Sequence, residues 1–193
     1  MNIFFLSSNP ILAAMMMCDK HIIKMILESA QILSTVYCLL SQNYHYIEQG
    51  LVYRPMNTYI NNPAVIWTMS SSANFQWLLT HAYALVREHT YRYNPKNVHK
   101  SSHIINFILD DFENIERLFK QHHLTKPALI MPKECQISSN PVKCYRYFYR
   151  HDKQDFAKWD KTRPRPGWWD TIHFNQKLAD ELSNKRIKRL SKK

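Results

Sequence analysis

Four polar side chains recur at helical spacing within an otherwise apolar stretch, CDKHIIKMILESAQILS, at residues 18–34. They are His21, Lys24, Glu28 and Gln31, and on a helix of about 100° per residue they share one narrow face. His21 and Glu28 lie two helical turns apart, with Lys24 between them. A carboxylate placed among Lys and His can act as a base or stabilise developing positive charge. This face indicates a candidate site, with Glu28 and His21 as candidate catalytic groups and Lys24 and Gln31 as candidate substrate-binding groups. An ordinary polar face in contact with bulk water is the alternative that this helix alone leaves open.

A second helical pattern, SANFQWLLTHAYALVREHTYRYN at residues 72–94, carries polar residues on the side opposite its expected solvent face. These are Asn74, His81, Glu88 and Arg92. Polar groups on an inward side must be paired or must line a cavity. We expect the two polar faces to meet across one shared cleft, with Arg92 paired to Glu28 or Glu88. A buried hydrogen-bonded network without a catalytic role is the alternative that the sequence leaves open.

The same two helices supply side chains that suit several divalent ions: Asp19, His21, His81 and Glu88. However, no H-x-x-x-H or E-x-x-H motif joins these four residues, and the sequence contains no C-x-x-C pair, no P-loop and no G-x-G-x-x-G. We therefore expect neither a metal nor an organic cofactor.

Aromatic and basic residues alternate in two later segments, CYRYFYRHDK and KTRPRPGWW. Nucleic-acid bases stack on such rings, while Arg and Lys hold phosphates. The formal net charge of +11 favours the same polyanionic partners. The sequence thus predicts nucleic acid as the partner and adds these substrate-binding residues: Lys100, Arg146, Arg163, Arg165, Trp168 and Trp169.

The composition indicates the fold that must position these residues. Only two Gly occur in 193 residues, of which 45% are apolar, and this favours helices over β-sandwiches. The pattern predicts an all-α fold, with one compact helical domain over residues 1–176 and a mobile basic C-terminal tail over 177–193. Four helices joined by long irregular connections are expected. The first covers 10–40 with a break near Asp19, and the second begins between residues 64 and 73 and ends near 93. The others cover 103–122 and 143–159.

Cysteine usage and the N-terminal segment bear on the compartment. The four cysteines form no C-x-x-C pair, and Cys18 and Cys38 lie in apolar helical pattern, so buried thiols in a reducing compartment are expected. The opening MNIFFLSSNPILAAMMM lacks the basic start of a signal peptide, and no run of about twenty apolar residues follows. We expect a cytoplasmic protein that is not secreted, with no membrane and no obligate protein partner.

Two motifs carry a resemblance to a known family. Asp19-Lys20-His21, followed by Glu28 seven residues after the histidine, and RPGWW at 165–169 resemble the phage-type pyrimidine-dimer DNA glycosylases, which are endonuclease V-like. The resemblance implies a small, basic, all-helical enzyme that removes bases from damaged double-stranded DNA and then cuts the strand as an AP lyase. The chain also looks like small phage or large-virus proteins that open with MNIF, which implies the cytoplasm of a host cell.

The resemblance also implies catalytic roles. In the family the N-terminal α-amine attacks C1′ of the damaged nucleotide and the glutamate, here Glu28, assists ring opening. Met is usually retained before a residue as large as Asn, so the free amine is expected on Met1, directly before Asn2. Lys24 is expected to replace one of the family's arginines.

Two other functions stay open on the sequence. The chain could be a non-catalytic viral nucleic-acid-binding protein whose inner polar residues form a buried network. It could also be a small enzyme that acts on nucleotides or bases, because a narrow polar cleft rimmed with aromatic side chains suits one flat ring.

Overall fold

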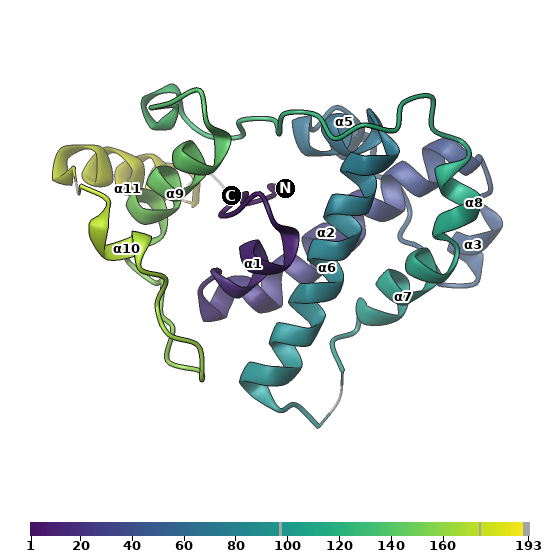
Figure 1. Cartoon of the computed structure of the whole chain (residues 1–193), viewed down its shortest axis with the longest axis horizontal. Coiled ribbons are helices and arrows are strands. Elements are labelled where there is room, and N and C mark those ends of the chain that lie inside the picture. Colours follow the sequence, from purple (N-terminus) through teal and green to yellow (C-terminus); the bar gives the residue numbers. More distant parts are fainter. Residues whose placement is uncertain (97, 174, 191–193) are drawn as a thin grey trace.

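The computed structural model describes residues 1–96, 98–173 and 175–190, and all regular secondary structure within them is helical (Figure 1). This confirms the all-α prediction. The elements are α1 (Pro10–Met15), α2 (Asp19–Ser41), α3 (His45–Glu48), α4 (Asn57–Ile60), α5 (Pro63–Met69), α6 (Ser72–Tyr93), α7 (Ser102–Asp110), α8 (Phe112–Glu116), η1 (Lys133–Cys135), α9 (Pro141–Lys153), α10 (Trp168–Thr171) and α11 (Gln176–Leu190).

Three helices begin at an Asn-Pro pair. The side chains of Asn9, Asn62 and Asn140 accept hydrogen bonds from backbone N–H groups in the first turns of α1, α5 and α9. The proline that follows each Asn suits the first helical position, where its missing N–H has no intrahelical partner in any case. A fourth pair ends a helix instead, because Asn94 adopts a left-handed conformation (φ 39°) after the last turn of α6.

The two long helices α2 and α6 pack against each other at the centre of the molecule (Figure 1). α1 lies along α6, and α5 and α7 contact both central helices. By length and composition α2 could cross a membrane, which the sequence analysis did not anticipate. However, 67% of its most apolar window is buried inside the fold, and the core position of α2 accounts for its apolar character.

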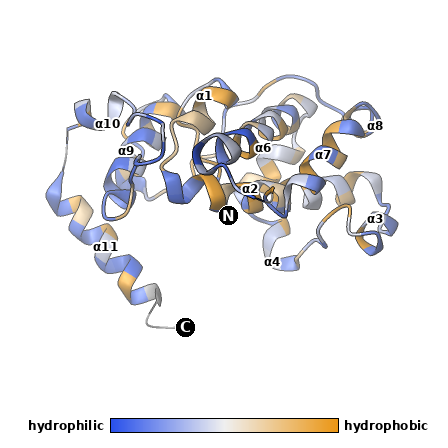
Figure 2. Ribbon diagram, turned by 90° about the horizontal axis from the view of Figure 1, so that it is seen from below, coloured by the Kyte–Doolittle hydropathy of each residue, from blue (hydrophilic) through white to orange (hydrophobic). Residues whose placement is uncertain are grey.

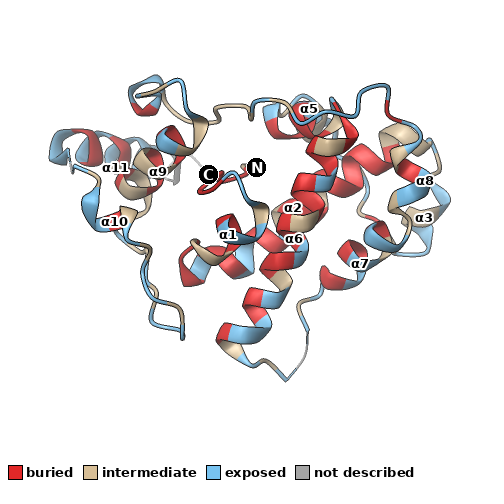
Figure 3. Cartoon of the chain, in the orientation of Figure 1, coloured by how far each residue is buried: buried red, intermediate tan, exposed pale blue. Residues whose placement is uncertain are grey.

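The N-terminal segment, residues 3–6, is buried between the central helices and α9 (Figure 3). Phe4 contacts the rings of Phe148 and Tyr149 on α9, at centroid distances of 6.2 and 5.1 Å. Phe5 contacts Trp67 on α5 and Trp77 on α6, at 4.9 and 4.2 Å. Apolar burial on both sides therefore fixes the first residues of the chain relative to α2 and α9.

One expected helix begins within its predicted range and another is divided. α6 begins at Ser72, inside the expected range 64–73, because Ser71 caps it by accepting a hydrogen bond from the backbone N–H of Asn74 (3.1 Å). The pattern at 103–122 forms α7 and the short α8, which separate at Asp111. Asp111 accepts a short hydrogen bond from the Tyr37 hydroxyl (2.5 Å), so this break ties the end of α7 to the central helix α2.

The predicted mobile basic tail at 177–193 is not confirmed. Residues up to 190 continue as α11, which packs against α9 (Figure 2). Leu178, Ala179 and Leu182 are buried, and their spacing places them on one helical face. Ile187, farther along the same helix, is 63% exposed.

Candidate active site

The backbone N–H of Asn2 donates a hydrogen bond to the carboxylate of Glu28, with 3.1 Å between N and Oε2. The Asn2 side chain is fixed as well, because its Nδ2 donates to the carbonyl of Ile130 at 2.8 Å. Its Oδ1 accepts from the hydroxyl of Tyr145 at 3.4 Å. The carbonyl of Met1 accepts from Asn62 Nδ2 at 3.3 Å. The start of the chain is thus held against Glu28 from several sides.

Glu28 occupies a half-buried position on α2. Its side chain is 16% exposed, and its second oxygen, Oε1, lies 3.2 Å from the Nζ of Lys24 one turn earlier. Lys24 is 65% exposed, so this ion pair contributes little to stability. The two carboxylate oxygens therefore have different partners, one in the N-terminal backbone and one on a cation that solvent and ligands can reach.

His21, predicted as a second catalytic residue, is buried beneath the N-terminal segment. Its ring stacks on Phe4 at a centroid distance of 5.0 Å. Burial, together with the neighbouring cations Lys153, Lys24 and Arg186, lowers the pKa of His21 to about 3. Its Nδ1 has no hydrogen-bond partner among the described residues. A neutral imidazole at physiological pH cannot donate the proton of an imidazolium, so the geometry gives His21 a packing role beside Glu28.

Burial of neutral histidines predicts that the protein loses stability in mild acid. The pKa of His21 is about 3 in the folded state and 6.5 ordinarily, so the unfolded state binds the extra proton between these values. Stability from this group is complete above pH 6.5 and falls as the pH drops towards 3. Protonation of His21 in the unfolded state should therefore lower the free energy of unfolding by about 2 kcal/mol between pH 7 and pH 5.

Urea unfolding at the two pH values tests this prediction. In His21→Phe, which keeps an aromatic ring against Phe4, the loss of stability between pH 7 and pH 5 should shrink by that amount. The same substitution at the exposed His123 should leave the loss unchanged. Equal losses in wild type and His21→Phe would contradict the assignment of a buried neutral His21.

A groove of about 750 Å³ opens beside Asn2. Residues from four parts of the chain line it: Asn2, Ile130, Met131, Pro132, Phe148, Asp152, Lys153, Leu182, Lys185 and Arg186. The segment 130–132 and α9 supply apolar walls, while α9 and α11 supply three cations. The groove adjoins Asn2, and the backbone N–H of the same residue contacts Glu28.

The prediction of a polar cleft shared by α2 and α6 is wrong, because the inward polar residues of α6 do not contact the predicted polar face of α2 in the structure described. Asn74 is fully buried and bonds the carbonyl of Trp67, Ser70 Oγ and Thr125 Oγ1 at 2.7 to 2.8 Å. His81 bonds the carbonyl of Pro10 at 2.9 Å, and burial lowers its pKa to about 4. Asn74 ties α5 and the loop at Thr125 to α6, and His81 ties the start of α1 to the same helix. Their positions match the alternative of a buried network.

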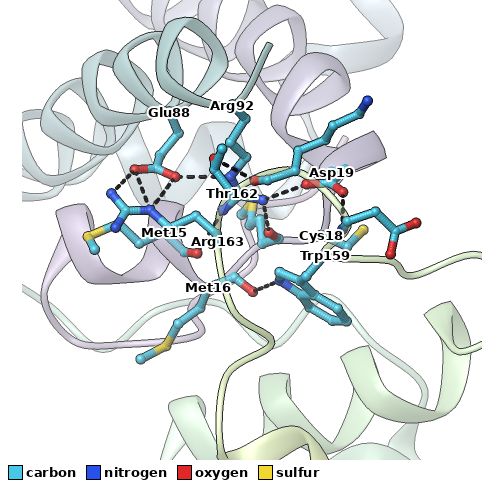
Figure 4. A network of polar contacts seen from close by, with 12 residues as sticks. Met15, Met16, Cys18, Asp19, Glu88, Arg92, Trp159, Thr162 and Arg163 are labelled. Carbon is cyan, nitrogen blue, oxygen red and sulfur yellow. Dashed lines mark hydrogen bonds and ion pairs between the residues drawn. The ribbon is translucent and has the colours of Figure 1, made fainter.

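Arg92 and Glu88 belong to a separate buried cluster at the start of α2 (Figure 4). Arg92 pairs with Glu88 at 3.0 Å, which confirms one of its two expected partners, and also with Asp19 at 3.0 Å. It donates further to the carbonyls of Met15 and Met17, both at 2.8 Å. Asp19, part of the Asp-x-His motif, thus serves to anchor Arg92.

The cluster extends to the loop before α10. Arg163 forms a bidentate pair with Glu88. Its Nη2 donates to Oε1 at 2.7 Å, and its Nε donates to Oε2 at 3.1 Å. Burial raises the pKa of Glu88, but hydrogen bonds from Arg163 and Arg92 outweigh burial and hold the pKa below its ordinary value. The backbone N–H of Asp160 donates to Asp19 at 2.8 Å. These contacts fasten the C-terminal segment to the core (Figure 4).

The other expected DNA-binding residues are dispersed. Arg146 donates to the carbonyl of Leu6 at 2.8 Å and lies over the Trp168 ring at 5.6 Å, next to a cavity of about 330 Å³. Trp169 is buried, and Arg165 pairs with Asp170 on the surface at 2.9 Å. Lys100 is exposed at the start of α7, and Gln31 is half-buried on α2. Within the described part of the chain, Lys24 is the expected substrate-binding residue that forms an ion pair with Glu28.

Sequence reasoning missed most of the residues that hold the N-terminus. Asn62, Ile130 and Tyr145 contact Met1 or Asn2 from 61, 128 and 143 residues away along the chain. No periodicity connects such distant positions. For Lys153 and Arg186, the sequence indicated only that they belong to basic segments, and not that they lie near Asn2. Among the described residues, no three His, Cys, Asp or Glu side chains gather in a way that could hold a metal ion.

Comparison with protein families bears directly on this site. A family model described as pyrimidine dimer DNA glycosylase matches residues 1–101. The chain belongs to the pyrimidine dimer DNA glycosylase family. The match includes Asn2, Glu28 and the helices α1 to α6, and it ends immediately before α7. Membership confirms the predicted resemblance and makes DNA the substrate.

No curated protein and no solved structure matches the chain. The family match covers the part of this glycosylase that holds the Asn2–Glu28 contact. The elements α7 to α11 lie outside the match.

Proposed function

We propose that this glycosylase excises pyrimidine dimers from double-stranded DNA and cuts the strand as an AP lyase, with an N-terminal amine as nucleophile and Glu28 as its proton acceptor. The observation that supports this most is the 3.1 Å contact between the backbone nitrogen of Asn2 and Glu28 Oε2. A nucleophile and its base need to lie within hydrogen-bond reach of each other.

The proposal requires removal of Met1 before catalysis, although Met is usually retained before a residue as large as Asn. While Met1 is present, the nitrogen of Asn2 is an amide, and resonance withdraws its lone pair from reaction. The amine of Met1 would then lie one residue away, at a spacing of about 3.8 Å between consecutive Cα atoms. Removal of Met1 would leave the α-amine of Asn2 at the atom that already contacts Glu28. The proposal therefore assigns the nucleophile to Asn2 rather than to the expected Met1.

In the proposed reaction one carboxylate, that of Glu28, first accepts a proton and later returns it. The amine nitrogen bonds to C1′ while the glycosidic C1′–N bond breaks, and the base leaves with that electron pair and gains a proton from water. The attacking nitrogen gives its proton to Glu28. The protonated Glu28 then returns a proton to the sugar O4′, which opens the ring and yields an imine.

Strand cutting follows from the imine. Loss of a proton from C2′ expels the 3′ phosphate, and water hydrolyses the imine to restore the amine. An ordinary α-amine has a pKa of about 7.7–8.0, against about 10.4 for lysine, so a substantial fraction of an N-terminal amine is nucleophilic near neutral pH. Lys24, ion-paired to Glu28 and largely exposed, is suited to hold a phosphate at the reacting nucleotide.

Incubation with ultraviolet-irradiated and undamaged duplexes tests the proposal, with base release and strand nicking scored separately. We expect both products on irradiated DNA and neither on undamaged DNA. Base release without nicking would exclude the AP-lyase activity from the proposal. Binding to both duplexes without any product would support the interpretation as a nucleic-acid-binding protein instead.

The proposed compartment is a reducing cytoplasm. All four cysteines are buried and unpaired, which supports this assignment.

A further inference from the structure

We propose that α11 and the end of α9 form a phosphate-binding wall for the DNA strand, through Lys153, Lys185 and Arg186. The inference rests on the proposed function, because it takes DNA at Asn2 and Glu28 as its starting point. It adds a substrate-binding element from the part of the chain that lies beyond the family match at residues 1–101.

The three cations line one groove together with Asn2. Among the described residues that line the groove, Asp152 is the one acidic residue, and it pairs with the adjacent Lys153. Lys185 lies 3.8 Å from Glu134, and both partners are at least half exposed, so a phosphate can compete for this lysine. The groove is thus positively charged on the side formed by α11.

The positive charge extends from the groove to the catalytic helix. Arg186 and Lys20 both lie over the ring of Phe156, at 5.1 and 5.6 Å from its centroid. Lys153 lies over the ring of Phe4 at 5.4 Å from its centroid, and Phe4 in turn stacks on His21 of α2 at 5.0 Å. A DNA backbone that leaves the reacting nucleotide near Asn2 would follow this line of cations.

α11 is anchored well enough to act as a fixed wall. Leu178 and Leu182 are buried on the side that packs against α9. The backbone N–H of Asn175, just before the helix, donates to His151 Nε2 at 2.8 Å. Ser183 Oγ bonds Asp155 at 3.2 Å. Lys185 and Arg186, one turn further on, are exposed on this anchored helix and line the groove.

The salt dependence of DNA binding tests the inference on the full chain. In the double variant Lys185→Ala/Arg186→Ala, the slope of log K against log salt should become shallower by about 1.8, because each phosphate contact contributes about 0.9. The matched control is Arg117→Ala/Lys120→Ala, which removes two exposed cations near α8, at the other end of the molecule from α11 (Figures 1 and 2). The control should bind with the wild-type slope.

Thermal unfolding of each variant separates a binding defect from loss of structure. If the double variant unfolds early through loss of the Arg186–Phe156 contact, the single variant Lys185→Gln serves instead, with an expected decrease in slope of about 0.9. Wild-type slopes in folded variants would overturn the inference even if the enzyme acts on dimers. A reduced slope in a protein that releases no base would support the wall and reject the proposed activity.

Discussion

Glu28→Gln is expected to reduce base release by about 10² to 10⁴, because a side-chain amide cannot accept the proton that the attacking amine must lose. The substitution is close to isosteric, and the amide oxygen can still accept the N–H of Asn2 that now bonds Oε2. Loss of the Lys24 ion pair should cost little, since Lys24 is 65% exposed. DNA affinity and stability should therefore stay near wild type while turnover falls.

Single-turnover assays with enzyme in excess would measure the chemical step directly. Binding to the same irradiated duplex, followed by fluorescence anisotropy, provides the parallel affinity. Glu113→Gln, an exposed carboxylate on α8, is the matched control and should retain full activity. A Glu28→Gln enzyme that keeps a tenth or more of the wild-type rate would exclude Glu28 as the proton acceptor.

Arg92→Ala is expected to lower the free energy of unfolding by about 3–5 kcal/mol, because it leaves buried carboxylates without their partner. The Arg92 side chain is fully buried, and its ion pairs reach Asp19 and Glu88. Two backbone carbonyls, of Met15 and Met17, would also lose their donors. Arg163 would remain as a partner for Glu88, but no arginine would remain in reach of Asp19 in the contacts described.

Urea unfolding measures this effect, with Arg87→Ala as the control. Arg87 lies on the same helix but is exposed, so its loss should change stability by less than about 0.5 kcal/mol. Arg92→Lys should also be destabilised, because a single ammonium cannot reproduce the forked contacts of a guanidinium. A near-neutral Arg92→Ala would show that the cluster contributes nothing to the fold.

Local features of the fold could be predicted from the sequence. Asn9-Pro10 and Asn94-Pro95 mark a helix start and a helix end because capping depends on a few adjacent residues. The pair of Glu88 and Arg92 follows from their spacing of four residues on one inward helical face. Glu28 could be singled out for the same reason, since its polar neighbours recur at helical spacing.

Long-range features could not be predicted in this way. A helical wheel tells which side of α6 points inward, but not which element it meets. His81 therefore meets the carbonyl of Pro10 and not α2. The contact between Asn2 and Glu28 depends on Ile130 and on a tyrosine of α9, which no local pattern connects. The last seventeen residues were interpreted from their basic charge, so the helical spacing of Leu178 and Leu182 was overlooked. These two buried side chains pack α11 against α9.

Borohydride reduction during the reaction, followed by mass spectrometry of the trapped peptide, tests most directly whether Asn2 and Glu28 form the active site. Reduction converts the imine into a stable bond between the protein and C1′. The account predicts an adduct on irradiated DNA at the α-amine of Asn2, in protein from which Met1 has been removed, and no adduct when that amine is blocked. Base release without any adduct, or an adduct on the side chain of Lys24, would contradict it.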